Sequence, residues 1–239
     1  MEHSLIIHMR GDEKRAPNVR VLLDSLPGAQ VMDAVRGREV VERGECHPHP
    51  GNLHKPTYPF PLSGGEVGCF LSHRSCWQRI LDEGWDMALI VEDDLALEPV
   101  AWADALALID KHATPDHFIR LPAKTREKSA KTLAKQGEAR LFLPRIPGLQ
   151  TVAQVVGRNA AEKVLNATRS LDRPVDTFLQ MHWVHGQPIH TILPNGVSEL
   201  TAELGGSTIQ KKTRTNGKLE REFKRAVYRT IVSMRPQRA

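Results

Sequence analysis

The sequence predicts an α/β fold in which strands and helices alternate around a central sheet. A short apolar run at residues 4–8 precedes a helix-period pattern, and a second apolar run follows at 29–32. Residues 87–91 are continuously apolar, which is typical of a central strand covered on both faces. The chain has 239 residues, of which 40% are hydrophobic and 26% charged. This is enough for one substantial domain and excludes a chain that is disordered throughout.

The opening elements indicate a β-α-β unit. The first predicted strand covers residues 4–8, and the helix after it has apolar positions at Val19, Leu22, Leu23 and Leu26. Pro27 and Gly28 end that helix, and the second strand, 29–32, stops at Asp33. Nucleotide-binding α/β folds begin in this way.

Residues 44–65 are predicted to form a long loop, because they contain five prolines and four glycines. His47, His49 and His54 lie in this segment. They admit two interpretations, a metal cluster or a plain polar loop. Since no acidic or cysteine ligand stands between them, the sequence favours the second interpretation.

A capping box, with Ser63 followed three residues later by Glu66, predicts a helix from this point to about Asp82. Its apolar face carries Phe70, His73, Trp77 and Ile80. Two interpretations of His73 are therefore open: it is a hydrogen-bonded histidine of the core, or it contacts a donor substrate. The apolar strand that follows ends abruptly at Glu92, Asp93 and Asp94.

The second half of the chain continues the alternation. We expect helices at 101–112 and 160–168 and strands at 118–121, 151–156 and 188–193. Residues 124–140 are polar and basic, and we expect a surface loop or a short helix there.

The acidic triplet Glu92, Asp93 and Asp94 is the strongest chemical signal. Side chains at the carboxyl end of such a strand project into the crevice where α/β folds bind ligands. Crowded carboxylates repel one another unless a cation is present, and Mg²⁺ or Mn²⁺ often shares oxygen ligands with substrate phosphates. The triplet alone leaves two readings open, a metal–diphosphate site or an acidic turn that ends a strand.

Cysteine content and hydropathy limit the compartment and the class of protein. Cys46, Cys69 and Cys76 show no CxxC spacing, so a disulfide scaffold or a structural zinc site is not expected. The sequence has no long apolar run and no recognisable signal peptide. We therefore expect a cytoplasmic protein.

The charge divides the chain at residue 206. Residues 207–239 carry a net charge of +8 and residues 1–206 a net charge of −3. We expect a domain at 1–206 and a basic tail at 207–239, with an amphipathic helix over 218–234. Two interpretations of this helix are open: it docks peripherally on the anionic inner face of a membrane, or it packs back on the domain. Nucleic-acid binding is not expected, because no recognised motif accompanies the charge.

The stretch Gly65 to His73, Trp77 and the run 87–94 closely resemble glycosyltransferase family 25, which contains bacterial lipooligosaccharide galactosyltransferases and collagen galactosyltransferases. Weaker likenesses occur in the family's order over most of residues 4–210. These are the first strand with Arg15, Asp33-Ala34, Arg120-Leu121, Pro174-Val175-Asp176 with Trp183, and Ser207-Thr208-Ile209.

The resemblance implies a GT-A-like, Rossmann-like fold with a mostly parallel sheet that binds a UDP-sugar and Mn²⁺ or Mg²⁺. Asp94 is expected to coordinate the metal directly. Asp93 and Glu92 are expected to contact the metal, the water molecules bound to it, or the ribose. Asp33 is expected at the nucleoside, and Arg10 and Arg15 at the diphosphate.

The implied function is an inverting, metal-dependent transfer of a hexose, galactose, to a lipopolysaccharide, lipooligosaccharide or other cell-surface glycan that can be lipid-linked. Asp176 is the first candidate for the base that takes the proton of the acceptor hydroxyl. The alternative interpretation of Asp176 is that it caps the N-terminus of a helix. Glu66 is the alternative base.

The sequence departs from the family at 151–154, and it has only two tyrosines. Trp77, Trp102, Trp183 or a phenylalanine is therefore expected to stack on sugar, and His185 or His190 is a candidate to complete a metal shell. A different donor sugar and a non-catalytic sugar-nucleotide scaffold remain the alternative functions, with a phosphohydrolase or an RNA-binding tail more distant.

Overall fold

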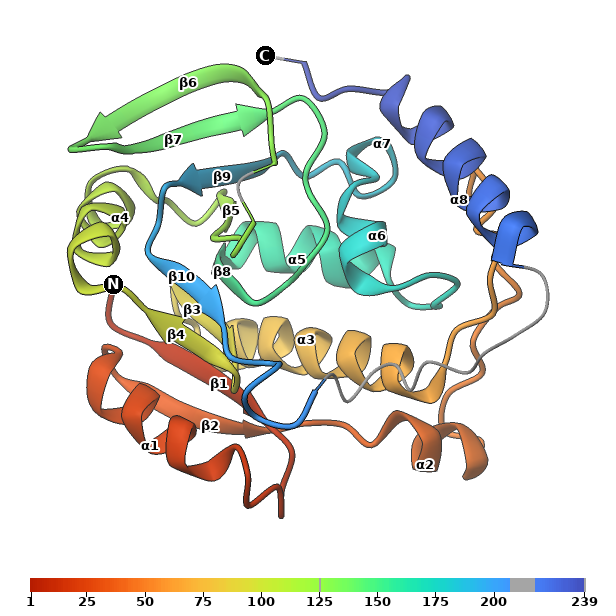
Figure 1. Cartoon of the computed structure of the whole chain (residues 1–239), viewed down its shortest axis with the longest axis horizontal. Helices are drawn as coiled ribbons and strands as arrows, with labels where there is room; N and C mark the ends of the chain where they lie inside the picture. The colour runs from red at the N-terminus through yellow and green to blue at the C-terminus, as the bar shows by residue number, and fades with distance from the viewer. Residues whose placement is uncertain (125, 207–217, 239) are drawn as a thin grey trace.

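The computed structural model describes residues 1–124, 126–206 and 218–238 (Figure 1). The elements in chain order are β1 (Ser4–His8), α1 (Ala16–Ser25), β2 (Ala29–Asp33), α2 (Gly37–Glu42), α3 (Gly64–Asp82), β3 (Met87–Glu92), β4 (Leu95–Leu97), α4 (Pro99–His112), β5 (Phe118–Arg120), β6 (Ser129–Gln136), β7 (Ala139–Pro144), β8 (Ala153–Gly157), α5 (Arg158–Ala167), α6 (Val175–Leu179), α7 (His182–His185), β9 (Ile189–Leu193), β10 (Val197–Glu199) and α8 (Lys218–Ser233).

The central sheet has eight strands in the order β2-β1-β3-β8-β5-β9-β7-β6. β1 pairs in parallel with β2 and β3, and β5 pairs in parallel with β9. β8 and β7 run against their neighbours, so six of the eight strands point the same way. β4 and β10 form a separate two-stranded antiparallel sheet. The expected α/β class and mostly parallel sheet are confirmed.

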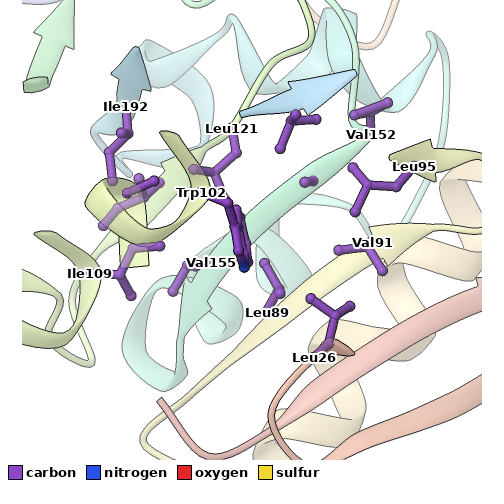
Figure 2. Close-up of a cluster of buried hydrophobic side chains, with 14 of the residues drawn as sticks. Leu26, Leu89, Val91, Leu95, Trp102, Ile109, Leu121, Val152, Val155 and Ile192 are labelled. Carbon is purple, nitrogen blue, oxygen red and sulfur yellow. The ribbon is translucent and has the colours of Figure 1, made fainter. Parts of the chain in front are cut away.

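Two hydrophobic cores lie on opposite faces of the sheet, because successive strand residues point to opposite sides. One core packs α1 and α4 against the sheet, and Figure 2 shows Trp102 of α4 at its centre, with Leu89 and Val155 from the strands beside it. The other core packs α3, α5 and α6, with Trp77 fully buried in it. Trp77 and Trp102 are thus core residues, which corrects the expectation that either one stacks on sugar.

The capping box that starts α3 is confirmed, since the Ser63 hydroxyl accepts from the Glu66 backbone and the Glu66 carboxylate accepts from the Ser63 backbone. Its first turns pack closely on α2. A Cβ on Gly68 would lie 2.5 Å from the Val35 carbonyl oxygen, and one on Gly37 would lie 2.1 Å from the Gly64 carbonyl oxygen. Only glycine at these positions allows the two backbones to approach so closely.

The expectation for residues 124–140 is wrong, because this part of the chain forms β6 and begins β7. β6 is the edge strand of the sheet, and seven of its eight residues are exposed. Polar, lysine-containing strands are typical of protected sheet edges. β6 therefore lacks the apolar alternation by which a strand is recognised in a sequence.

The C-terminal helix α8 packs on the domain beside α6 and α7 (Figure 1). Among residues 220–233 of this helix, Tyr228 and Val232 are buried, and the Tyr228 hydroxyl accepts a 3.0 Å hydrogen bond from the buried guanidinium of Arg173. Arg173 also donates to the carbonyl oxygens of His54 and Pro56 in the long loop. One arginine therefore holds the loop and α8 on the domain. Among the described helices, none has the length and apolarity needed to cross a bilayer.

The division of the chain at 206 and 207 falls at the limit of the described residues. The Ser207-Thr208-Ile209 segment and the basic residues at 211–214 lie outside them.

Candidate active site

The acidic triplet lies at the carboxyl end of β3, as the sequence predicts. Ile7 pairs with Glu92 in the parallel register of β1 and β3, so the next residue of β1, His8, reaches Asp93. The side chain of Asn18 in α1 donates to the carbonyl oxygens of Asp93 and Leu95. These contacts fix the turn that carries the triplet.

Both carboxylate oxygens of Asp93 are already engaged. Oδ1 accepts from Arg15 Nη1 at 2.5 Å, and Oδ2 lies 2.7 Å from His8 Nδ1. Arg15 precedes α1 and is buried, with its other guanidinium nitrogen 3.1 Å from Asp94 Oδ2. Arg15 thus neutralises part of the triplet's charge. Asp93 therefore fixes the side chains of Arg15 and His8 in this arrangement.

Asp94 is buried, and one of its carboxylate oxygens has no partner among the described residues. Oδ2 accepts from Thr201 Oγ1 at 2.9 Å and faces Arg15. Oδ1 is buried and accepts no hydrogen bond from the part of the chain that the structure describes. Burial and the neighbouring charge of Glu92 raise the pKa of Asp94. An orphaned carboxylate oxygen of this kind costs free energy unless a cation or donor reaches it, so this part of the triplet fits a hard divalent cation.

Glu92 stands on the other side of the triplet and is partly exposed. Its Oε1 accepts from Thr151 Oγ1 at 2.8 Å and lies 3.3 Å from His73 Nε2. Burial raises the pKa of Glu92, but the hydrogen bonds and charge of His73 and the bond from Thr151 outweigh it and leave that pKa below its usual value. Glu92 is therefore ionised near neutral pH and is available as an oxygen ligand.

Two cavities meet at the triplet. Cavity A, of about 340 Å³, lies at the carboxyl ends of β1 and β2 and is lined by Val35, by glycines of α2 and α3, and by Arg36 and Arg38. Cavity B, of about 510 Å³, lies toward α6 and α8. Arg15, Cys69 and Glu92 line both cavities. A ligand in one cavity can therefore meet a ligand in the other beside the triplet.

Asp176 and Glu66, the two candidate bases, both line cavity B with Asp94. Asp176 lies in the first turn of α6, and the residue at the N-cap position is Pro174. Its Oδ1 accepts from the backbone N–H of Thr177 at 2.6 Å, and Oδ2 accepts from the backbone N–H of Gln150 at 3.2 Å. Glu66 Oε2 is held by the capping box. Within Asp176, Oδ2 is thus the less firmly held of the two oxygens.

Arg10 and Asp33 are brought together, but away from the cavities. Arg10 Nη2 lies 3.7 Å from Asp33 Oδ2, and both side chains are exposed. Neither lines cavity A or cavity B. Their expected contacts with the diphosphate and the nucleoside stay predictions.

The histidines outside the triplet are dispersed. Within the described residues, His47, His49 and His54 belong to no group of three candidate metal ligands. His185 accepts from the Gln187 backbone and lies 3.3 Å from the Leu179 carbonyl oxygen, so its ring is engaged in the α7 turn.

Several site residues were not singled out from the sequence: His8, Asn18, Thr151, Gln154 and Thr201. Thr151 and Gln154 come from the segment that departs from the family's pattern, and both contact the network around Glu92 and His73. Tyr58 lines cavity B and provides an aromatic surface there. Arg225 and Arg229 of α8 also line cavity B.

Carboxylates and an arginine lie at the edge of the sheet where the parallel strands β1, β2 and β3 end, which is where α/β folds commonly bind their ligands. The chain belongs to glycosyltransferase family 25 (LPS biosynthesis protein), whose pattern matches residues 1–179. The fully buried His73 and the triplet fall within this match.

Relatives from animals share part of the chain. Procollagen galactosyltransferase 2 of Homo sapiens is 28% identical over 185 residues, covering 71% of this chain and 28% of the relative. Procollagen galactosyltransferase 1 of Danio rerio is 34% identical over 94 residues, covering 38% and 15%. Inactive glycosyltransferase 25 family member 3 of Mus musculus is 37% identical over 91 residues, covering 36% and 15%. The chain thus spans less than a third of the length of these relatives.

Among solved structures, a Drosophila β-1,4-galactosyltransferase 7 in complex with manganese, UDP-Gal and xylobiose aligns with 94% of this chain and 79% of its own, at 11% identity and a TM-score of 0.38.

Proposed function

We propose that this chain transfers a hexose, galactose, from a UDP-sugar to a hydroxyl of a lipopolysaccharide, lipooligosaccharide or other cell-surface glycan, with inversion at the anomeric carbon. The observation that carries the proposal is the acidic triplet at the junction of two cavities, with a buried, unpartnered oxygen on Asp94. Family membership supports the reaction class. The names of the human and zebrafish relatives support galactose as the sugar.

Cavity A is suited to the nucleotide half of the donor. It lies where ligands of α/β sheets bind, at the carboxyl ends of parallel strands. Its basic side chains and the first glycines of α3 offer positive charge and open backbone to a diphosphate. Arg15, placed between the cavities, would orient the diphosphate while holding Asp93 and Asp94.

The cation proposed here is Mn²⁺ or Mg²⁺, held by Asp94 and Glu92. When bound, it would supply a Lewis acid that stabilises the negative charge of the departing UDP. Asp93 would contribute indirectly, because both of its oxygens already hold His8 and Arg15. Thr201 and Thr151 keep the carboxylates of Asp94 and Glu92 oriented.

Cavity B is suited to the acceptor. Asp176 would accept the proton of the attacking hydroxyl at Oδ2, the oxygen with the longer hydrogen bond. Glu66 remains the alternative base, because it lines the same cavity. Tyr58 would give the acceptor sugar an apolar face to stack on.

We further propose that α8 contacts the anionic inner face of a membrane, at which a lipid-linked acceptor would be presented. Phe223 and Met234 are 69% and 75% exposed, and Val227 and Ile231 are also exposed on this basic helix. Apolar side chains flanked by cationic ones bind anionic lipid surfaces. Co-sedimentation with anionic vesicles, reduced by Phe223→Glu, would support this; equal binding to zwitterionic vesicles would oppose it.

The transferase proposal is tested by UDP release from a panel of UDP-sugars with Mn²⁺, a glycan acceptor extract, and EDTA as control. Release from one sugar, blocked by EDTA, supports the proposal, and the anomeric configuration of the product decides inversion. UDP binding without release from any sugar would favour the second candidate, a non-catalytic sugar-nucleotide scaffold. That candidate is supported by the mouse relative named inactive.

A further inference from the structure

Three potential metal ligands of different chemistry converge on the wall between cavities A and B. Cys69 and His73 lie four residues apart in α3 and therefore on one face of the helix. Glu92 at the end of β3 faces them. One ligand atom from each of the three residues lies within 4.8 Å of the other two. The described part of the chain contains no second group of this kind.

The spacing within this cluster fits a tetrahedral ion. His73 Nε2 and Glu92 Oε1 are 3.3 Å apart. Two ligands at about 2.0–2.1 Å from a tetrahedral zinc are roughly 3.3 Å from each other, and a thiolate at about 2.3 Å lies slightly farther out. The Cys69 thiol lies within 4.8 Å of both atoms and supplies the third ligand.

Gln154 supplies a second, independent observation. Its side chain is fully buried, its Nε2 lies 2.6 Å from His73 Nδ1, and its Oε1 has no hydrogen-bond partner in residues 1–124, 126–206 and 218–238. The amide orientation that turns Oε1 toward Nδ1 gives that oxygen a partner. In the metal-bound state it holds the imidazole proton on Nδ1, so that an Nε2 lone pair facing the ion replaces the Nε2–H···Glu92 hydrogen bond of the metal-free state. Metal-bound histidines are oriented in this way by an acceptor behind the ring.

We propose that Cys69, His73 and Glu92 form a binding site for a thiophilic divalent cation, Zn²⁺, with its fourth position open to the two cavities. A thiolate and an imidazole select zinc over Mg²⁺ or Mn²⁺, which prefer oxygen ligands. Binding releases the thiol proton of Cys69 to solvent. The site shares Glu92 with the oxygen site at Asp94, but the binding claim does not depend on the proposed transferase activity.

One consequence does depend on that activity. Because Glu92 belongs to both proposed sites, zinc bound at Cys69 and His73 would withdraw it from Mn²⁺. Zinc would then inhibit a Mn²⁺-supported reaction by competing for this carboxylate.

The first test uses Co²⁺ as a spectroscopic probe of the full chain. Cobalt bound to a thiolate gives a near-ultraviolet sulfur-to-metal charge-transfer band. We expect this band at one equivalent, its loss on adding Zn²⁺, its absence in Cys69→Ser and its retention in Cys46→Ser. Cys46 is a matched control, because it is also a half-buried free thiol and lies outside the cluster. No band, or a band that survives Cys69→Ser, would overturn the proposal.

A second test needs no variant and therefore does not depend on how Cys69→Ser folds. The native protein is alkylated with iodoacetamide with and without Zn²⁺, and each cysteine is followed by mass spectrometry. We expect zinc to slow alkylation of Cys69 by about tenfold or more and to leave Cys46 unchanged. Equal rates at Cys69 with and without zinc would overturn the site, whether or not the protein transfers sugar.

The role of Gln154 is tested by measuring the zinc affinity of the protein in competition with a chelator. Gln154→Met keeps the side-chain volume but removes the acceptor behind His73. We expect a loss of affinity of about 10- to 100-fold, the usual effect of removing such a partner. An unchanged affinity would refute the orientation assigned to Gln154.

Discussion

Arg15→Gln is the substitution whose effect on stability follows most directly from the structure. The guanidinium of Arg15 lies 2.5 Å from Asp93 Oδ1 and 3.1 Å from Asp94 Oδ2. The three side chains are 8%, 7% and 6% exposed, so solvent screens these pairs little. The substitution removes the cation and leaves two buried carboxylates next to each other.

The expected loss of stability is large. Removing one partner of a buried ion pair costs about 3–5 kcal/mol, which is a substantial part of the roughly 5–15 kcal/mol that stabilises a typical domain. His8 and Thr201 keep one hydrogen bond each to Asp93 and Asp94. These contacts limit the loss to that range although two carboxylates are affected.

Urea unfolding followed by circular dichroism measures this loss, with Arg10→Gln as the matched control. Arg10 also faces a carboxylate, at 3.7 Å, but its side chain is 85% exposed. An exposed pair of this kind contributes about 0–1 kcal/mol. Mn²⁺ should restore part of the stability of Arg15→Gln, because a cation at Asp94 replaces the missing charge. A loss for Arg15→Gln no larger than that for Arg10→Gln would refute the reasoning.

Three further predictions concern the base, the C-terminal helix and a buried histidine. Asp176→Asn should lower kcat by about 10²–10⁴ with little change in donor KM, measured as UDP release with saturating acceptor; an unchanged kcat would exclude it as the base. Tyr228→Phe removes the hydrogen bond to Arg173 and should cost about 1.5–3 kcal/mol in urea unfolding, whereas Phe223→Ala at an exposed position should cost under about 0.5 kcal/mol. Burial lowers the pKa of His185 to about 4, so the unfolded chain takes up its proton first and stability falls as the pH drops from about 6.5 to about 4. His185→Gln should therefore show a shallower loss of stability between pH 7 and pH 5, and an identical slope would contradict this.

The features that the sequence predicted well depend on local chemistry. Ser63 and Glu66 form a capping box from backbone and side-chain atoms three residues apart, so their role can be read from the sequence. Residues 88–91 of the apolar run are buried on both faces, and the carboxylates after it had to emerge at the strand's end. In both cases the determining residues are neighbours in the chain.

The features that were missed depend on neighbours that are remote in the chain. Thr201 reaches Asp94 across 107 positions, and Gln154 reaches His73 across 81. No local pattern marks either residue. The hairpin of β6 and β7 was missed for a different reason, since β6 is an edge strand exposed on both faces with charged side chains and has no apolar period to recognise.

The C-terminal helix forms as the sequence predicts, but the domain covers a different face of it. The apolar stripe in the sequence includes Phe223, Val227 and Ile231, and these side chains are exposed. The side chains that the domain buries are Tyr228 and Val232, which lie off that stripe. A sequence gives the period of a helix, but it does not give the face that the domain covers.

The central claim is that the free oxygen of Asp94 receives the cation that binds the donor. It is tested most directly by titrating Mn²⁺ into the protein with and without UDP, for the native chain, Asp94→Asn and Asp24→Asn, whose exposed carboxylate lines neither cavity. The account predicts that UDP tightens Mn²⁺ binding in the native chain and in Asp24→Asn, and that Asp94→Asn weakens it by at least about tenfold and abolishes the effect of UDP. Mn²⁺ and UDP binding that is the same in Asp94→Asn as in the native chain would contradict it.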